Sequence, residues 1–177
     1  HTHTRGMKEK FINRSGLCVV LTCLIVSSCS SSSTPLPDGA NARIVKVVDG
    51  DTVDVAMNGR TERIRLIGVD TPETKKPNTP IQCFGPEASE HIESLLPVGT
   101  PVLVQRDIEA RDPFGRLLGY IYRTSDNLFV NQDLIVNGFA RPLSIAPNTA
   151  FASEFARLAQ AARSTKTGLW GECPSEP

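Results

Sequence analysis

Charged residues frame a short apolar run between Arg65 and Glu73. The segment RLIGVDTPE begins with Arg65, continues through a strand-like run of Leu, Ile, Gly and Val, and ends with Asp70 and Glu73. A strand that only packs a core needs neither a guanidinium at one end nor two carboxylates at the other. We therefore take this segment as the first candidate for chemistry.

Asp51 and Asp70 could bind one divalent cation. Each lies at the end of a strand-like run, and in a barrel these two ends can lie side by side. A main-chain carbonyl and water could complete the roughly six to eight oxygen ligands of calcium. Neither cysteine nor histidine is placed to help, so zinc and copper are not expected. The simpler alternative is that DGDTV, residues 49–53, is only a turn and Asp70 only a strand terminus.

The remaining groups suit phosphodiester hydrolysis. Pro72 keeps the chain from becoming helical, so Glu73 could face a water molecule near the metal and act as general base. Arg65 and Arg116 could donate bidentate hydrogen bonds to a phosphate oxygen, which strengthen as charge builds in the transition state. Read alone, Arg65 is an exposed strand charge and RDPFGR, residues 111–116, is another turn.

No competing catalytic apparatus is visible in the sequence. The histidines are His1, His3 and His91. The first two precede the expected mature chain, and we expect His91 on a helix surface, which excludes paired-histidine ribonuclease chemistry. Neither a GxSxG motif nor a Walker-type phosphate loop occurs.

Residues 1–29 have the features of an export signal. Residues before Met7 precede the expected start methionine, and we expect them to be an artefact. Basic residues follow Met7, and the apolar run 17–26 is too short for a bilayer, which needs about 20 residues. VSSC resembles a bacterial lipobox with the lipid on Cys29, plain cleavage being the alternative. We expect an exported protein anchored to a bacterial membrane, on its periplasmic or cell-surface side.

The cysteines divide in the same way. Cys18 and Cys23 would leave with the signal and Cys29 would carry the lipid. Cys83 and Cys173 then remain as a pair in an oxidising compartment. We predict that they form a disulfide bond.

Local patterns predict an α+β fold, a β-barrel with helices, over residues 42–173. Residues 30–41 are a Ser/Pro-rich tether and 174–177 a tail. Three strand-like runs lie in 42–69, and Asn58-Gly59 is a strong hairpin signal. Two more strands are expected at 100–107 and 115–123, and three helices at 85–97, 127–138 and 149–168. This order favours a five-stranded oligonucleotide-binding (OB-fold) barrel with about three helices.

The charge of the expected mature chain argues against a general basic surface. The whole chain has 19 Lys+Arg and 19 Asp+Glu. Four of the basic residues and one acidic residue precede Cys29. The expected mature chain therefore has 15 Lys+Arg and 18 Asp+Glu, which gives it a net charge of −3. Affinity for a polyanion must therefore come from local arginines.

Five motifs resemble the staphylococcal nuclease (thermonuclease) family in order and spacing. They are VVDGDTV, RLIGVDTPET, GPEAS, DPFGR followed by YIY, and the terminal GLW, together covering about 42–170. The resemblance implies a five-stranded OB-fold barrel, here as an exported, lipoprotein-type member. It also implies calcium-dependent hydrolysis of DNA and RNA, with cleavage of the 5′ P–O bond leaving 3′-phosphorylated products.

The resemblance also implies residue roles. The metal ligands would be Asp51, Asp70 and the Thr71 carbonyl, with Asp49 as an acidic neighbour. Glu73 would be the base or an organiser of water, and Arg65 and Arg116 the phosphate clamps. We expect a monomeric calcium-dependent nuclease; the alternative is a catalytically weak or silent nucleic-acid-binding OB-fold module.

The sequence departs from the family pattern around the substrate. The segment ARPLSIAPN, residues 140–148, lacks the two tyrosines expected near the nucleotide base. Phe114 replaces a tyrosine and Pro113 a lysine. Lys75 and Lys76 are candidate phosphate contacts, unless they belong only to a solvated loop. We expect weaker substrate affinity than in a basic member of the family.

Overall fold

The computed structural model describes residues 36–75, 78 and 80–174, and the statements below concern those residues. The expected signal, Cys29, most of the tether and Lys76 lie outside them, so export and lipidation stay predictions. In the described ranges, no helix is both long enough and apolar enough to cross a membrane.

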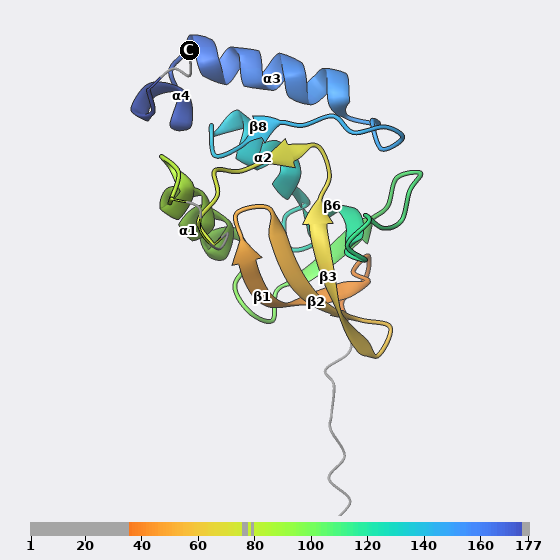
Figure 1. The fold of residues 1–177 in the computed structure, drawn as a ribbon. Coiled ribbons are helices and arrows are strands. Elements are labelled where there is room, and N and C mark those ends of the chain that lie inside the picture. Colours follow the sequence, from red (N-terminus) through yellow and green to blue (C-terminus); the bar gives the residue numbers. More distant parts are fainter. Residues whose placement is uncertain (1–35, 76–77, 79, 175–177) are drawn as a thin grey trace, which may run out of the picture. The chain divides into compact units, whose positions relative to one another are not determined.

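Five strands close into a barrel (Figure 1). They are β1 (Ala42–Asp49), β2 (Thr52–Met57), β3 (Arg60–Leu66), β5 (Pro101–Gln105) and β6 (Leu117–Arg123). Antiparallel neighbours follow the order β3-β2-β1-β5-β6, and parallel pairing of β3 with β6 closes the ring. The predicted five-stranded OB-fold barrel is confirmed.

The hairpin between β2 and β3 forms where Asn58-Gly59 predicts it. Both residues have positive φ, 50° for Asn58 and 75° for Gly59, as a two-residue hairpin turn requires. Along β3 buried and outward residues alternate, with Ile64 and Leu66 at 0% and 1% exposure. This alternation sends Arg63 and Arg65 to the outer face of the barrel.

The three predicted helices are present as α1 (Gly85–Leu95), α2 (Val130–Val136) and α3 (Ala152–Ser164). α2 packs against both α1 and α3, and it covers β6. The buried side chains of these helices join one core with the barrel, among them Ile92, Leu134 and Phe155. Four shorter elements were not predicted: β4 (Val69–Asp70), β7 (Leu128–Phe129), β8 (Arg141–Pro142) and α4 (Leu169–Glu172).

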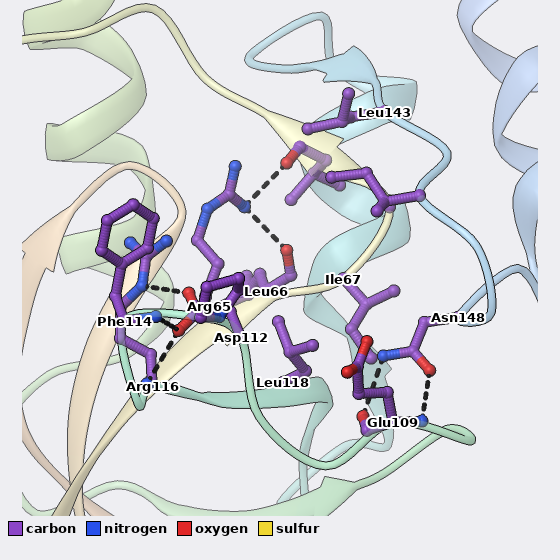
Figure 2. A pocket seen from close by; sticks show the side chains of 14 residues that line it. Arg65, Leu66, Ile67, Glu109, Asp112, Phe114, Arg116, Leu118, Leu143 and Asn148 are labelled. Atoms are coloured by element: carbon purple, nitrogen blue, oxygen red, sulfur yellow. Dashed lines mark hydrogen bonds and ion pairs between the residues drawn. The ribbon is translucent and has the colours of Figure 1, made fainter.

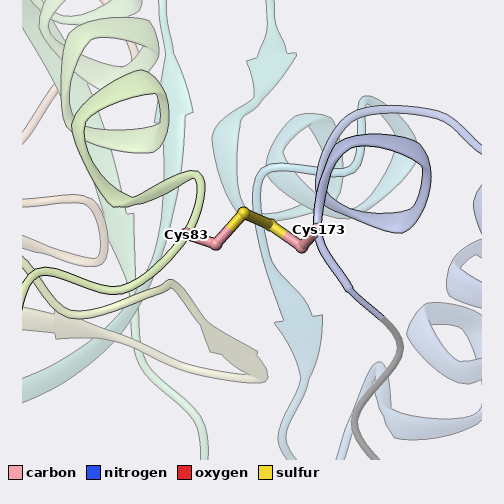
Figure 3. The surroundings of a disulfide bond; sticks show 2 residues. All are labelled: Cys83 and Cys173. Atoms are coloured by element: carbon pink, nitrogen blue, oxygen red, sulfur yellow. A yellow bond between two sulfur atoms is a disulfide. The ribbon is translucent and has the colours of Figure 1, made fainter.

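The predicted disulfide is present between Cys83 and Cys173 (Figure 3). The two residues are 90 positions apart in sequence, and their Cα atoms are 5.8 Å apart. The bond joins the segment that leads into α1 to the residue that follows α4. It therefore closes most of the domain into a covalent loop.

The predicted surface position of His91 is wrong. His91 lies on α1, but its side chain is only 21% exposed. Its Nε2 is 2.6 Å from Oδ1 of Asp133 on α2, and its ring stacks on Phe139 at 3.8 Å. The helix pattern could not show that α2 and the residues after it cover this face.

Candidate active site

Asp49 anchors the turn that leads into the site. Its Oδ1 accepts hydrogen bonds from the Gly50 backbone at 2.9 Å, the Thr74 hydroxyl at 2.7 Å and the Ser89 hydroxyl at 3.2 Å. The turn is thereby tied to the loop after β4 and to α1. Asp49 thus acts within the fold as a loop anchor beside the candidate metal ligands.

The turn brings Asp51 against the end of β4. A Cβ atom on Gly50 would lie 2.7 Å from Oγ1 of Thr71, so only glycine permits this approach. Oδ2 of Asp51 accepts a 3.4 Å hydrogen bond from the Thr71 backbone N–H. Oδ1 accepts a second bond from the Thr52 hydroxyl at 2.9 Å. Asp51 therefore contacts the backbone of Thr71, 20 residues away in sequence, at the end of β4.

Arg65 joins the two predicted metal carboxylates. Its Nη2 is 3.1 Å from Oδ2 of Asp51 and 3.5 Å from Oδ1 of Asp70. Its Nη1 donates to the carbonyl oxygens of Leu66 and Val69, both at 2.8 Å (Figure 2). These contacts hold the guanidinium in place, and its side chain is 14% exposed.

The chemistry of this donor set fits calcium. In the described part of the chain, no three His, Cys, Asp or Glu side chains form a metal-binding cluster. What converges is two carboxylates, Asp51 and Asp70, next to the backbone of Thr71. A hard cation that accepts water among its ligands suits such an oxygen set, and the Asp70 side chain is 55% exposed. A thiolate- or imidazole-preferring metal does not suit it.

Asp112 holds the second arginine, and this role was missed. Arg116 donates from Nε to Oδ2 of Asp112 at 2.6 Å and from its backbone N–H to Oδ1 at 2.9 Å. Burial raises the pKa of Asp112, but these hydrogen bonds outweigh it and keep the pKa below its usual value. The signal in the sequence is the four-residue spacing between Asp112 and Arg116 within RDPFGR, a motif in which the family resemblance assigns a role to Arg116 but none to Asp112.

Arg65 and Arg116 line the same cleft, of about 240 Å³ (Figure 2). Its wall is mostly aliphatic, formed by Leu66, Ile67, Leu118, Leu143 and Ile145. Leu143 and Ile145 belong to the segment in which no tyrosine was found. The cleft therefore offers charge at one end and apolar surface along the rest.

The far side of the cleft was not predicted. Glu109 and Asn148 line it, and a reciprocal pair of hydrogen bonds ties them together. The Glu109 N–H donates to Oδ1 of Asn148 at 2.7 Å, and Nδ2 of Asn148 donates to the Glu109 carbonyl at 2.9 Å. No local pattern links residues 39 positions apart.

Glu73 lies in a structured loop beyond Asp70. Its Oε1 accepts hydrogen bonds from the backbone N–H groups of Thr74 at 3.1 Å and Lys75 at 2.9 Å. Gln82 clamps its backbone, accepting from the Glu73 N–H at 2.8 Å and donating to its carbonyl at 3.0 Å. The Lys75 ammonium donates to the Val48 carbonyl at 2.5 Å. One candidate phosphate contact is thus engaged within the fold.

A closed OB-fold barrel with two arginines in one cleft, and two aspartates beside one of them, suits a phosphodiester ligand. Comparison with known proteins agrees with this class. The family described as staphylococcal nuclease homologue matches residues 63–172. The chain belongs to the staphylococcal nuclease family.

Individual relatives span most of the chain. It is 33% identical over 164 residues to a thermonuclease of Staphylococcus hyicus, covering 88% of this chain and 95% of the relative. It is 36% identical over 132 residues to a thermonuclease of Staphylococcus intermedius, covering 75% and 77%. It is 37% identical over 133 residues to endonuclease YncB of Bacillus subtilis (strain 168); this match covers 75% of the chain but 62% of that relative.

Proposed function

We propose that the protein is a calcium-dependent nuclease that hydrolyses DNA and RNA and leaves 3′-phosphorylated products. The observation that carries this proposal is the cleft shared by Arg65 and Arg116, with Asp51 and Asp70 in contact with Arg65. Relatives named thermonuclease and endonuclease support it.

Residues that line the cleft would bind the phosphate, and the carboxylates that contact Arg65 beside the cleft would bind the metal. Asp51, Asp70 and the Thr71 carbonyl would hold calcium, which when bound supplies positive charge to polarise a phosphoryl oxygen. Arg65 and Arg116 bind the phosphate oxygens. Because the neighbouring protein groups hold both guanidiniums, they need little rearrangement as negative charge grows in the transition state.

Glu73 would take the proton from the attacking water or orient that water. Two backbone N–H groups bind Oε1, which fixes the carboxylate relative to its loop. The Asp49 contacts with Thr74 and Ser89 hold the loop against the barrel. A positioned base of this kind contributes about 10²–10⁴-fold to rate.

The experiment that tests this function is degradation of fluorescent single-stranded DNA by the protein, first with calcium and then with excess chelator. We expect calcium-dependent cutting, with 3′-phosphate ends identified by mass spectrometry. Absence of cutting by a protein shown to be folded by circular dichroism would contradict the proposal. The silent nucleic-acid-binding module would then be the better description.

The cellular setting is a separate proposal. The basic, apolar and small-residue pattern before Cys29 supports export followed by lipid attachment at that residue. We expect the protein, a monomer, in the membrane fraction of an expressing bacterium, and a Cys29→Ser variant in the soluble exported fraction. Equal partition of both proteins would exclude the lipid anchor.

A further inference from the structure

A second groove lies next to the cleft, on the outer face of β2 and β3. It has a volume of about 460 Å³ and is lined by Asp54, Thr61, Arg63, Phe114, Gly115 and Arg116. Phe114 and Arg116 also line the cleft, so the two hollows meet at these residues. A ligand held by Arg116 can therefore extend into either.

Strand β3 aligns the groove with the cleft. Arg63 and Arg65 point to the same outer face because Ile64 between them is fully buried. Residues two apart on a strand are about 7 Å apart, close to the spacing of successive phosphates in an extended nucleic-acid strand. Thr61 continues the row, exposed, toward the hairpin. The outer face of β3 thus leads away from Arg65 in steps of about one nucleotide.

Arg63 is held in place yet remains accessible. Its Nε and Nη2 donate to the two carboxylate oxygens of Asp54, its cross-strand partner, at 2.8 and 3.0 Å. The Arg63 side chain is 51% exposed, while that of Asp54 is 16% exposed. Arg116 on Asp112 has a similar arrangement, a partly exposed guanidinium supported by a more deeply buried aspartate. In the described ranges, no hydrogen bond engages Nη1 of Arg63.

Phe114 indicates what kind of strand the groove accepts. Its side chain is 84% exposed at the junction of the two hollows. Such a ring offers a stacking surface to an unpaired base. In a duplex the base faces are already stacked, so this surface favours a single strand.

We propose that the groove binds the part of a single nucleic-acid strand adjacent to the phosphate under attack, with Arg63 on the neighbouring phosphate. The identity of the ligand rests on the proposed function. The expected mature chain has a net charge of −3, so strand affinity depends on local cations such as Arg63. Asp54 reduces the net charge of the groove, but its two hydrogen bonds hold the Arg63 guanidinium in place.

The test is fluorescence anisotropy of the full chain with a labelled oligothymidylate of roughly twelve nucleotides, in chelator so that nothing is cut. We expect Arg63→Gln to weaken binding about fivefold at low salt. The slope of log affinity against log salt should fall by about 0.7, the value for one phosphate contact on a single strand. Binding of thymidine 5′-monophosphate, which is too short to reach Arg63 from the cleft, should not change.

Two further variants separate the proposal from a folding defect. Thr61→Lys adds a cation to the exposed end of the groove and should tighten oligonucleotide binding. Arg157→Gln removes an arginine on α3 whose Nε and Nη2 donate to both carboxylate oxygens of Glu154, as those of Arg63 donate to Asp54. This variant therefore controls for the change in net charge. We expect no change in its binding beyond a small uniform shift.

If Arg63→Gln binds the oligonucleotide with unchanged affinity and unchanged salt slope, the proposal that the groove binds a nucleic-acid strand is overturned. Equal losses in Arg63→Gln and Arg157→Gln would overturn it too. If the wild-type protein cuts DNA and Arg63→Gln binds the oligonucleotide normally, the proposed strand-binding role of the groove is contradicted and the proposed nuclease activity is not. If the wild-type protein never cuts but Arg63→Gln binds weakly, the proposed nuclease activity fails and the groove stands as a binding site.

Discussion

Asp112 supports Arg116 from behind, with one carboxylate oxygen on the side chain and the other on the backbone. The distances are 2.6 Å from Nε to Oδ2 and 2.9 Å from the backbone N–H to Oδ1. The Asp112 side chain is 10% exposed and that of Arg116 is 32% exposed. The aspartate is therefore buried behind the guanidinium, whose accessible part faces the cleft.

Arg116→Ala should reduce kcat by at least a hundredfold, because loss of one electrostatic clamp costs roughly 3 kcal/mol or more. Asp112→Asn leaves the guanidinium in place but less firmly held, so we expect a smaller loss, about tenfold. Steady-state kinetics on single-stranded DNA measures both. Near-normal turnover of Arg116→Ala, with an unchanged circular dichroism spectrum, would remove Arg116 from the mechanism.

The same pair predicts a pH dependence of stability. The pKa of Asp112 is lowered in the fold, and a carboxylate with a lowered pKa stabilises the folded state above its ordinary pKa. That contribution is lost as the pH falls through the lower, folded-state pKa. Asp112→Asn should therefore cost about 1–3 kcal/mol at pH 7, and progressively less below about pH 4. Urea unfolding at several pH values measures this, and a difference independent of pH would contradict it.

Asp51→Ala should abolish calcium binding at the proposed metal site beside Arg65. It removes one of only two carboxylates in the donor set, and it leaves Arg65 paired with Asp70 alone. Isothermal titration calorimetry with calcium measures the effect. Asp126→Ala, in an ion pair with Arg123 on the far end of β6, is the matched control and should titrate like the wild type. An unchanged titration of Asp51→Ala would place the metal elsewhere.

Removal of the disulfide should destabilise the domain without changing the cleft. A bond that closes a loop between residues 90 positions apart is worth about 4 kcal/mol in the chain-entropy model. We expect a paired Cys83→Ser, Cys173→Ser variant to lose a similar free energy of unfolding in urea, while turnover at low temperature is retained. Reductant should destabilise the wild type and leave the variant unaffected. Equal sensitivity of both proteins to reductant would contradict this account.

Phe114→Ala should weaken binding of single strands, because a stacked base is worth about 1–3 kcal/mol. Phe114→Tyr keeps the ring and should bind almost normally. Val98 is 77% exposed, nearly as much as Phe114, and lies outside both hollows, so Val98→Ala controls for loss of exposed apolar surface. Anisotropy with single-stranded and duplex oligonucleotides compares the variants. A loss that is equal for duplex and single strand would argue against stacking.

Local sequence alone determined the elements of the barrel and most of the chemical groups. Asn58-Gly59 predicted the hairpin because its backbone preference acts within two residues. The three strand-like runs in 42–69 predicted β1, β2 and β3 for the same local reason. Residue types at the ends of these strands suggested Asp51 and Asp70 as oxygen ligands and Arg65 and Arg116 as phosphate contacts, because carboxylates suit hard cations and guanidiniums suit phosphate oxygens; these roles stay predictions.

Only the tertiary structure decided which distant segments meet. β4 pairs with β8, Asp133 covers His91, and Asn148 closes the cleft against Glu109; none of these contacts has a local signal. Their partners lie about 40 to 70 positions apart, where packing of whole elements, rather than the preference of any one residue, selects the neighbour. The outward-facing residues of β3 show both the local and the tertiary contribution. Alternation places Arg63 and Arg65 on one face, but the approach of the loop that carries Phe114 and Arg116 makes that face a groove.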